Sequence, residues 1–185
     1  MTTIHSFKSQ MAGGGARPNQ FRVTLTFPTF VGGQVAERQI PFMVSSASLP
    51  EQTLGVASVQ FRGREIKWAG DRTTSPWTVN CYNDTDFEIR SAMETWSQGI
   101  VENETNRGRT GTIQYQTQAL VEQLDRNDQV LKAYKFIDLW PIQVGEISLD
   151  FGANDQIEVF PITFDYLYFL TDNVDGQVGV DGPVA

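Results

Sequence analysis

The chain has 185 residues, 40% of them hydrophobic and 19% charged, which is enough apolar material for one folded core and argues against global disorder. Its 14 Lys and Arg against 22 Asp and Glu give a net charge of −8, which argues against gripping nucleic acid through its phosphates. No apolar run reaches the ~18 residues of a membrane span and no leader pattern opens the chain, so we expect a soluble, unexported protein. Cys81 is the only cysteine, so no intrachain disulfide can form.

The acidity is concentrated in the last quarter of the chain. Nine acidic residues and no Lys or Arg follow Lys135, whereas the preceding part holds fourteen basic and thirteen acidic residues. A scattered acidic surface that maintains solubility and a functional acidic surface both remain open.

The first half of the chain predicts an arm, two strands and a loop. Residues 1–15 lack periodicity and include Gly13-Gly14-Gly15, so we expect a flexible arm. Alternation from Phe21 to Phe27 predicts a half-buried strand. Arg38 to Val44 is interpreted as a strand interrupted by Pro41, and the Ser-rich segment Ser45 to Gly55 as a long loop.

The middle of the chain predicts two strands and one helix. Val56 to Trp68 and Trp77 to Tyr82 have strand character. Thr85 followed by Glu88 predicts a capping box, and an apolar stripe at helical spacing predicts that the helix packs on a sheet. The stripe comprises Ile89, Ala92, Met93, Trp96 and Ile100, with Gly99 as the expected stop.

The last part predicts a loop, two hairpins and a tail. Asn103 to Gly111 is the loop, and the first hairpin joins Ile113–Val121 to Val130–Leu139. The second joins Glu146–Phe151 to Ile157–Leu170, with a bulge near Pro161. Thr171 to Ala185 is expected to be a mobile tail.

Together, about seven or eight strands and one helix predict a mainly β fold. We expect a sandwich or barrel of two packed antiparallel sheets with one flanking α-helix. The predicted organisation is an arm at 1–15, a β domain at 16–170 and a tail at 171–185.

Residue types that carry catalysis are scarce, so the sequence predicts no enzyme. His5 is the only histidine and lies in the arm, and Cys81 sits among the apolar residues of a strand. No spacing matches a zinc or calcium site, so we predict no catalytic residue, metal or cofactor. A carboxylate pair such as Glu146 and Asp150 stays open, although surface acids on a strand are roughly ten times commoner.

Several short motifs, spread in order over residues 16–168, resemble the tail tube protein of contractile-tailed bacteriophages. They are Ala16-Arg17-Pro18-Asn19 with Phe21, Ser48-Leu49-Pro50, Ala69-Gly70-Asp71-Arg72 with Thr73, Trp77-Thr78-Val79, Leu139-Trp140-Pro141, Gly145-Glu146-Ile147 and Leu149-Asp150. The arm before Ala16 and the tail after Leu170 lie outside this resemblance.

The resemblance implies a structural virion protein whose six copies close into a ring, with rings stacking into a tube that conducts the genome. It also implies a surrounding sheath protein, baseplate and tail terminator proteins as partners, and a place in the virion tail after assembly in the host cytoplasm. Tube proteins of type VI secretion and of phage-derived injection machines share the architecture and are the alternative.

Physical reasoning adds candidate surfaces to this implied assembly. A DNA conduit must not bind phosphates, so the acidic or polar positions Glu146, Ser148, Asp150 and Asp165 are lumen candidates. The predicted long loop is a candidate inter-ring bridge through Ser48, Leu49, Pro50, Glu51, Gln52, Thr53 and Leu54. A stand-alone ligand-binding β-barrel, with Phe160, Phe164, Tyr166 and Tyr168 lining a pocket, is a second class of function.

Overall fold

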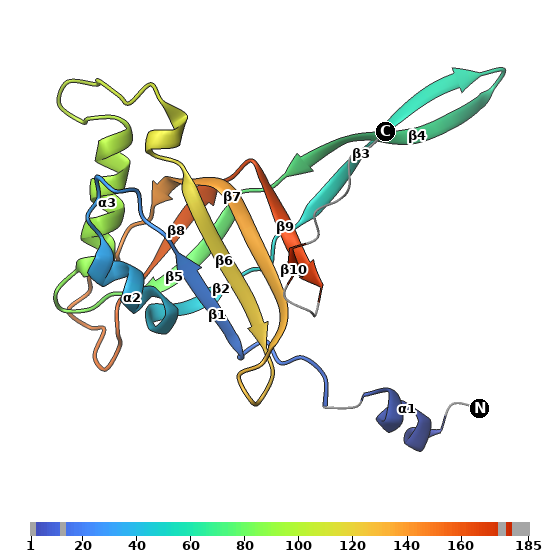
Figure 1. Ribbon diagram of the computed structural model, residues 1–185, viewed down its shortest axis with the longest axis horizontal. Helices are drawn as coiled ribbons and strands as arrows, with labels where there is room; N and C mark the ends of the chain where they lie inside the picture. Colours follow the sequence, from blue (N-terminus) through green and yellow to red (C-terminus); the bar gives the residue numbers. More distant parts are fainter. Residues whose placement is uncertain (1–2, 12–13, 174–176, 179–185) are drawn as a thin grey trace.

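Two antiparallel sheets sharing one long strand form the body of the protein. The computed structural model describes residues 3–11, 14–173 and 177–178, and Figure 1 shows the arrangement. The first sheet contains β1 (Phe21–Leu25), β6 (Thr117–Leu124), β7 (Val130–Val144), β9 (Tyr168–Asn173) and the short β10 (Gln177–Val178). The second contains the end of β7, β8 (Val159–Asp165), β5 (Trp77–Tyr82) and β2 (Val44–Ala47). The predicted fold class is therefore confirmed.

Strand β7 belongs to both sheets because it bends at two irregularities. Its first part pairs with β6 and β9, whereas Trp140–Val144 pairs with β8. Asp138 has a positive φ of 56° where the pairing with β6 shifts, and Ile142 is the extra residue opposite β8. The predicted bulge at Pro161 is wrong, since Pro161 pairs with Asn80 in unbroken register. β8 alternates regularly between buried and less buried residues from Val159 to Asp165, and Ile157, which does not fit this alternation, precedes the strand.

The core lies between the sheets and is dominated by aromatic side chains. Trp77 of the second sheet stacks on Phe136 of the first with ring centroids 4.4 Å apart. The alternating residues Val23 and Leu25 are buried, as β1 was predicted to bury them. Burial of such side chains contributes about 1.5–3 kcal/mol each and supplies most of the stability.

Helices α2 (Gln34–Met43) and α3 (Glu88–Ile100) pack against each other and against the strands. Ile89, Ala92, Met93 and Trp96 of α3 are buried, which confirms the predicted stripe. The predicted capping box is wrong, because the N-cap is Phe87 in a left-handed conformation without a side-chain cap. Asp84 Oδ1 instead accepts from the Glu88 amide at 3.3 Å.

Helix α2 replaces the strand predicted at Arg38 to Val44. Pro41 lies inside the helix, where it removes one backbone donor near the C-terminal end. Ala36 and Ile40, four residues apart, are buried, and Glu37 Oε1 accepts from the Phe27 amide at 2.6 Å. Tertiary packing therefore decides for a helix where the local pattern favoured a strand.

Three further segments differ from the sequence prediction. Ser45 to Gly55 is not one loop, because β2 covers Val44–Ala47 and β3 (Gln52–Phe61) begins at Gln52. The predicted strand at Glu146–Phe151 does not form, and β8 pairs instead with β5 and the end of β7. β6 begins at Thr117, after a 3₁₀ turn at Thr112–Gln114, so Ile113 is exposed.

The two ends of the chain also carry structure. Residues Ile4–Gln10 form helix α1, whose residues are all exposed, within the segment expected to be an arm. β9 continues to Asn173, so Thr171 to Asn173 belong to a strand and not to a tail. Residues 174–176 and 179–185 of the predicted tail lie outside the described residues.

Candidate functional site

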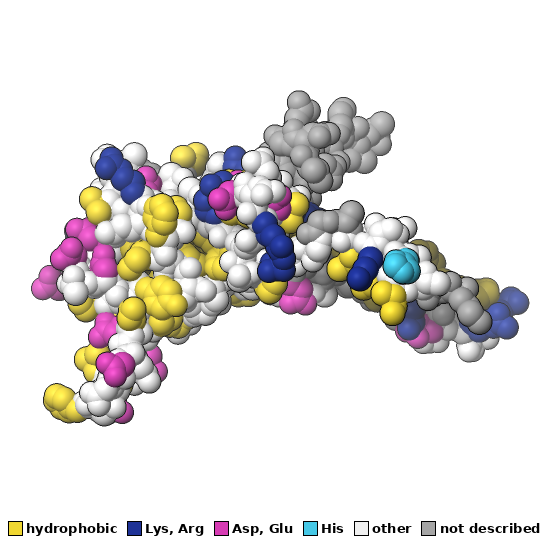
Figure 2. Space-filling view, turned by 90° about the horizontal axis from the view of Figure 1, so that it is seen from below, with side chains coloured by type: hydrophobic (Ala, Val, Ile, Leu, Met, Phe, Trp, Pro, Cys, Tyr) yellow, Lys and Arg dark blue, Asp and Glu magenta, His cyan; other side chains and the backbone are white. Residues whose placement is uncertain are grey.

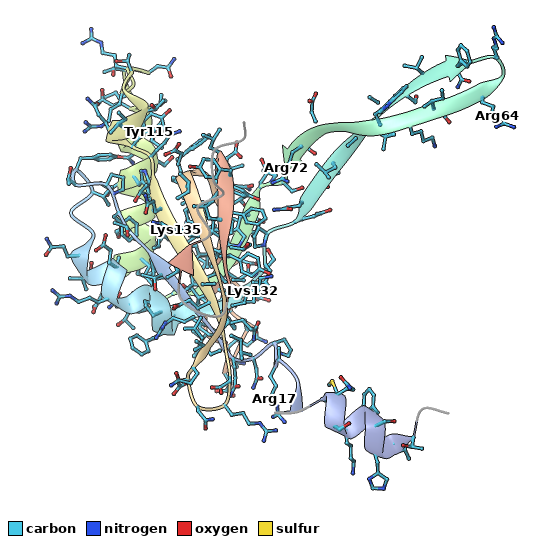
Figure 3. The ribbon with its side chains drawn as sticks, turned by 45° about the vertical axis from the view of Figure 1, so that its right-hand side comes forward. Arg17, Arg64, Arg72, Tyr115, Lys132 and Lys135 are labelled. Carbon is cyan, nitrogen blue, oxygen red and sulfur yellow. The ribbon has the colours of Figure 1, made fainter. Side chains whose placement is uncertain are left out.

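A two-stranded hairpin projects from the body and is the most prominent surface feature of the protein. It consists of β3 and β4 (Arg64–Thr74), which within the described residues pair only with each other (Figure 1). Every residue of β3 is exposed. Figure 3 shows Arg64 at the tip of this projection and Arg72 near its root. A two-stranded hairpin is marginally stable alone and gains stability when it packs against further protein.

The register makes the hairpin amphipathic. Residues paired directly across an antiparallel ladder lie on the same face. Val59 pairs with Ile66 and Ala57 with Trp68, so these side chains share one face with Phe61. Ser58 pairs with Lys67 and Gln60 with Glu65 on the other face. We call these the apolar face and the polar face of the hairpin.

The apolar face is open to solvent although its side chains are large. Val59, Phe61, Ile66 and Trp68 are 56%, 57%, 41% and 54% exposed. Contiguous exposed apolar surface of this kind marks interaction sites in folded proteins. Val56 to Trp68 was predicted to be a single strand, whereas the structure divides it between β3 and β4; the dipeptide Arg62-Gly63 is the sequence signal that could have predicted the hairpin. Both residues have positive φ, 47° and 80°, as a two-residue turn between paired strands requires.

The root of the hairpin contains the residues predicted to bridge rings. Gln52, Thr53 and Leu54 open β3 opposite Thr74, Thr73 and Arg72. Ser48 is fixed to the body, because its carbonyl accepts from Trp77 Nε1 at 2.8 Å, while Leu49 and Glu51 are exposed. Gly55 and Gly70 cross so closely that a Cβ on Gly70 would lie 2.9 Å from the Gly55 carbonyl carbon. The predicted bridge residues thus form the base of the projection and not a free loop.

The exposed face of the second sheet is polar and almost uncharged. Its strands β2, β5, β8 and the Trp140–Val144 part of β7 contain no Lys or Arg, and Asp165 is their only charged residue. Asn80 Nδ2 donates to Ser46 Oγ at 2.8 Å, and the hydroxyls of Thr78 and Thr163 lie 3.3 Å apart. The exposed face of the first sheet differs, since it carries an Arg22–Glu122 ion pair at 2.7 Å.

The four predicted lumen residues are divided between two places. Asp165 ends β8 opposite Trp140, in phase with Thr163 on the polar face of the second sheet. Glu146, Ser148 and Asp150 are exposed in the loop that follows β7, so the strand face that was to group them does not exist. That loop, residues 146–158, also exposes Leu149, Phe151 and Ile157 at 81%, 107% and 71%.

Within the described residues, the groups that could carry chemistry are dispersed. His5 lies on the exposed α1, and no three His, Cys, Asp or Glu side chains are grouped to hold a metal there. Cys81 is buried, and this burial raises the pKa of its thiol to about 12, so the thiol stays protonated near neutral pH. In the part of the chain described, no helix is long and apolar enough to cross a membrane.

The aromatic set proposed for a ligand pocket belongs mainly to the core. Phe160, Phe164 and Tyr166 are at most 3% exposed, and only Tyr168 reaches the surface. The void between Trp77, Met93 and their neighbours is about 10 Å³, less than a small ligand needs. The interior is therefore packed, and the surfaces of the protein are its candidate functional regions.

The chain is similar in sequence to known tail tube proteins. A tail tube protein of Serratia phage KSP90 is 29% identical over 174 residues, which cover 93% of this chain and 98% of that protein. The tail tube protein gp19 of Enterobacteria phage T4 is 32% identical over 154 residues, covering 82% and 89%.

A solved structure shares the fold. A chain in the structure of an extracellular contractile injection system, the PVC sheath-tube complex in the extended state, matches with a TM-score of 0.61 at 14% identity, covering 93% of this chain and 99% of that one. The family model described as phage tail tube protein matches residues 16–172. The chain therefore belongs to the phage tail tube protein family, which confirms the resemblance carried by its motifs.

Proposed function

We propose that this protein assembles with copies of itself into the inner tube of a contractile phage tail, in rings of six that stack. The observation that carries the proposal is the β3–β4 hairpin, whose apolar face has no cover in the described chain. The tube conducts the phage genome to the host during tail contraction. The protein acts by assembly and has no enzymatic role.

A tube requires two different contacting surfaces on each subunit. A head-to-tail interface produces a ring when its rotation closes and a filament when it does not, so stacked rings need one set of contacts around the ring and another along the axis. The hairpin supplies a projecting surface, with Ser48, Leu49, Pro50, Glu51 and the start of β3 at its root. Free edges of the second sheet, at β2 and at Trp140–Val144, supply another, because unpaired strand edges join readily.

The polar face of the second sheet has the chemistry that a DNA conduit needs. Each Lys or Arg that contacts a phosphate adds affinity by releasing counterions, and this would slow passage of the genome. The strands of this sheet carry no such residue, and Asp165 repels phosphates within a screening length of about 8 Å. We therefore assign this face, with Asp165, to the lumen and leave Glu146, Ser148 and Asp150 out of it.

The opposite side of the sandwich has the charged face of the first sheet, including Arg22 and Glu122. We assign this side to the outer wall, where it meets the tail sheath protein. Baseplate and tail terminator proteins contact the two ends of the tube. The protein functions in the virion tail after assembly in the host cytoplasm.

The test uses the purified full chain and a variant in which residues 54–72 are replaced by a short Gly-Ser turn. We expect rings or tubes of the full chain by negative-stain microscopy, with or without isolated baseplates as seeds. The variant should remain monomeric at an unchanged melting temperature, because the hairpin contributes nothing to the core. Wild-type monomers that never join a seed, or variant rings equal to wild type, would refute the proposal.

The alternative is the tube of a type VI secretion system or of a phage-derived injection machine. Its subunit would have the same physical design, so biochemistry of the isolated chain does not separate the two. A sheath gene among other phage tail genes beside this one supports the phage tube, and secretion-system genes there support the alternative.

A further inference from the structure

The loop at residues 146–158 forms a second unpartnered surface, at the other end of the body from the hairpin (Figure 1). Leu149, Phe151 and Ile157 are largely exposed on it. A surface hollow of about 390 Å³ is lined by residues of this loop, including Ile147, Leu149 and Ala153. A hollow edged by large apolar side chains fits an apolar partner better than it fits solvent.

The charges of this loop and of the hairpin are opposite. Residues 146–158 contain four acidic residues and no Lys or Arg, whereas residues 52–74 contain four basic residues and two acidic ones. Arg62 in the hairpin turn and Arg64 directly after it take part in none of the ion pairs found in the described residues. In Figure 2, basic side chains lie at the right-hand end, at the hairpin tip, and acidic ones gather toward the left.

The hairpin and the 146–158 loop also lie at different ends of the subunit, as a head-to-tail contact requires. A contact that repeats from copy to copy must join different patches at different ends of the subunit. The hairpin strands, at about 3.3 Å per residue, extend roughly 30 Å, which is enough to reach across to a neighbour. Each surface thus combines exposed apolar side chains with a net charge, which is positive on the hairpin and negative on the loop.

From these observations we infer that the hairpin of one copy docks on the 146–158 loop of the next copy. The apolar face, with Val59 and Trp68, covers Leu149 and Phe151, and the tip arginines lie against the acidic residues Glu146 and Asp150. This contact deepens the proposed function and rests on it, since it names the surface that receives the hairpin in the tube.

Charge exchange tests the pairing in the full-length protein. Arg62→Glu with Arg64→Glu, and separately Glu146→Lys with Asp150→Lys, should each raise the concentration needed for assembly about tenfold, because like charges then face each other. Combining the four changes should restore assembly to within about threefold of wild type. Glu104→Lys, an exposed acid in another loop, is the matched control and should have no effect.

Cross-linking gives a direct readout of the same contact. Val59→Cys and Ala153→Cys are made in separate chains and mixed under assembly conditions with a bismaleimide, while buried Cys81 does not react. We expect cross-links between the two variants and none within either alone. Cross-links between two Val59→Cys chains would overturn the inference.

The outcomes separate this inference from the function on which it rests. If hairpin variants prevent assembly but the loop variants do not, the hairpin still acts in the tube and the loop is not its receiver. If the variant with all four substitutions needs a higher concentration for assembly than either double variant, the inferred charge pairing is also wrong. If the wild-type chain forms no ring or tube even with seeds, the proposed function fails and this inference fails with it.

Discussion

The amphipathic hairpin predicts that two adjacent substitutions of the same kind have opposite consequences. Val59 lies on the apolar face and Gln60 on the polar face, and both are exposed in the isolated chain. We expect Val59→Lys to prevent tube formation and Gln60→Lys to permit it. Both variants should fold as the wild type does, because neither residue reaches the core.

The magnitude follows from the exposed fraction. Full burial of a valine contributes about 1.5–3 kcal/mol, and Val59 is 56% exposed, so its remaining surface is worth about 1 kcal/mol on docking. The lysine charge adds a desolvation cost of roughly several kcal/mol at a covered site, reduced if the side chain can reach solvent. Together these terms raise the concentration for assembly at least about tenfold, since 1.4 kcal/mol is a factor of ten.

The assay is sedimentation of assembled material over a concentration series, with thermal unfolding of the monomer as the fold control. The melting temperatures of the two variants should agree with that of the wild type within about 2 °C. Equal loss of assembly in Gln60→Lys would show that the faces are not distinct. A large drop in the melting temperature of Val59→Lys would show that the hairpin contributes to the core.

Three further predictions concern the body of the protein. Gly145→Ala should lower the free energy of unfolding by about 1–3 kcal/mol in denaturant titrations, because its Cβ would clash with the ring of Pro161. Cys81 should resist a thiol reagent until the protein unfolds. Burial raises the pKa of its thiol from 9.0 to about 12. Between these pH values only the unfolded thiol ionises, so the free energy of unfolding should fall as pH rises through that interval. Tyr166→Phe should raise the free energy of unfolding by about 1–3 kcal/mol in denaturant titrations, because it removes a buried hydroxyl that has no hydrogen-bond partner among the described residues.

Local patterns in the sequence were sufficient for the elements whose partners lie nearby in the chain. Asp125 to Gln129 was expected to turn, and Asp125 Oδ1 does accept from the amides of Asn127 and Gln129. The period-2 burial of β1 and the period-3.6 burial of α3 follow from side-chain geometry and needed no tertiary information.

The pairing of strands that are distant in the chain could not be predicted from local sequence patterns. Leu149 and Phe151 alternate with polar residues as a strand would, yet the strand expected to pair with them, β8, already has β5 on one side and β7 on the other. Pro41 favoured an edge strand, but burial of Ala36 and Ile40 stabilises a helix around it. Such choices depend on which surface is available, and that is a property of the folded chain.

For the candidate site, too, some features follow from the sequence and others only from the tertiary structure. The sequence by itself determined a mainly β protein, whose ordered motifs indicated a tail tube and whose acidic residues are concentrated after Lys135. Only the tertiary structure decided that Asp165 lies on the otherwise uncharged second sheet while Glu146 and Asp150 lie in a separate loop, and that Val59 and Trp68 share an open face. The reason is physical, because strand register and pairing set which side chains share a surface, and both are fixed by contacts between residues far apart in the chain.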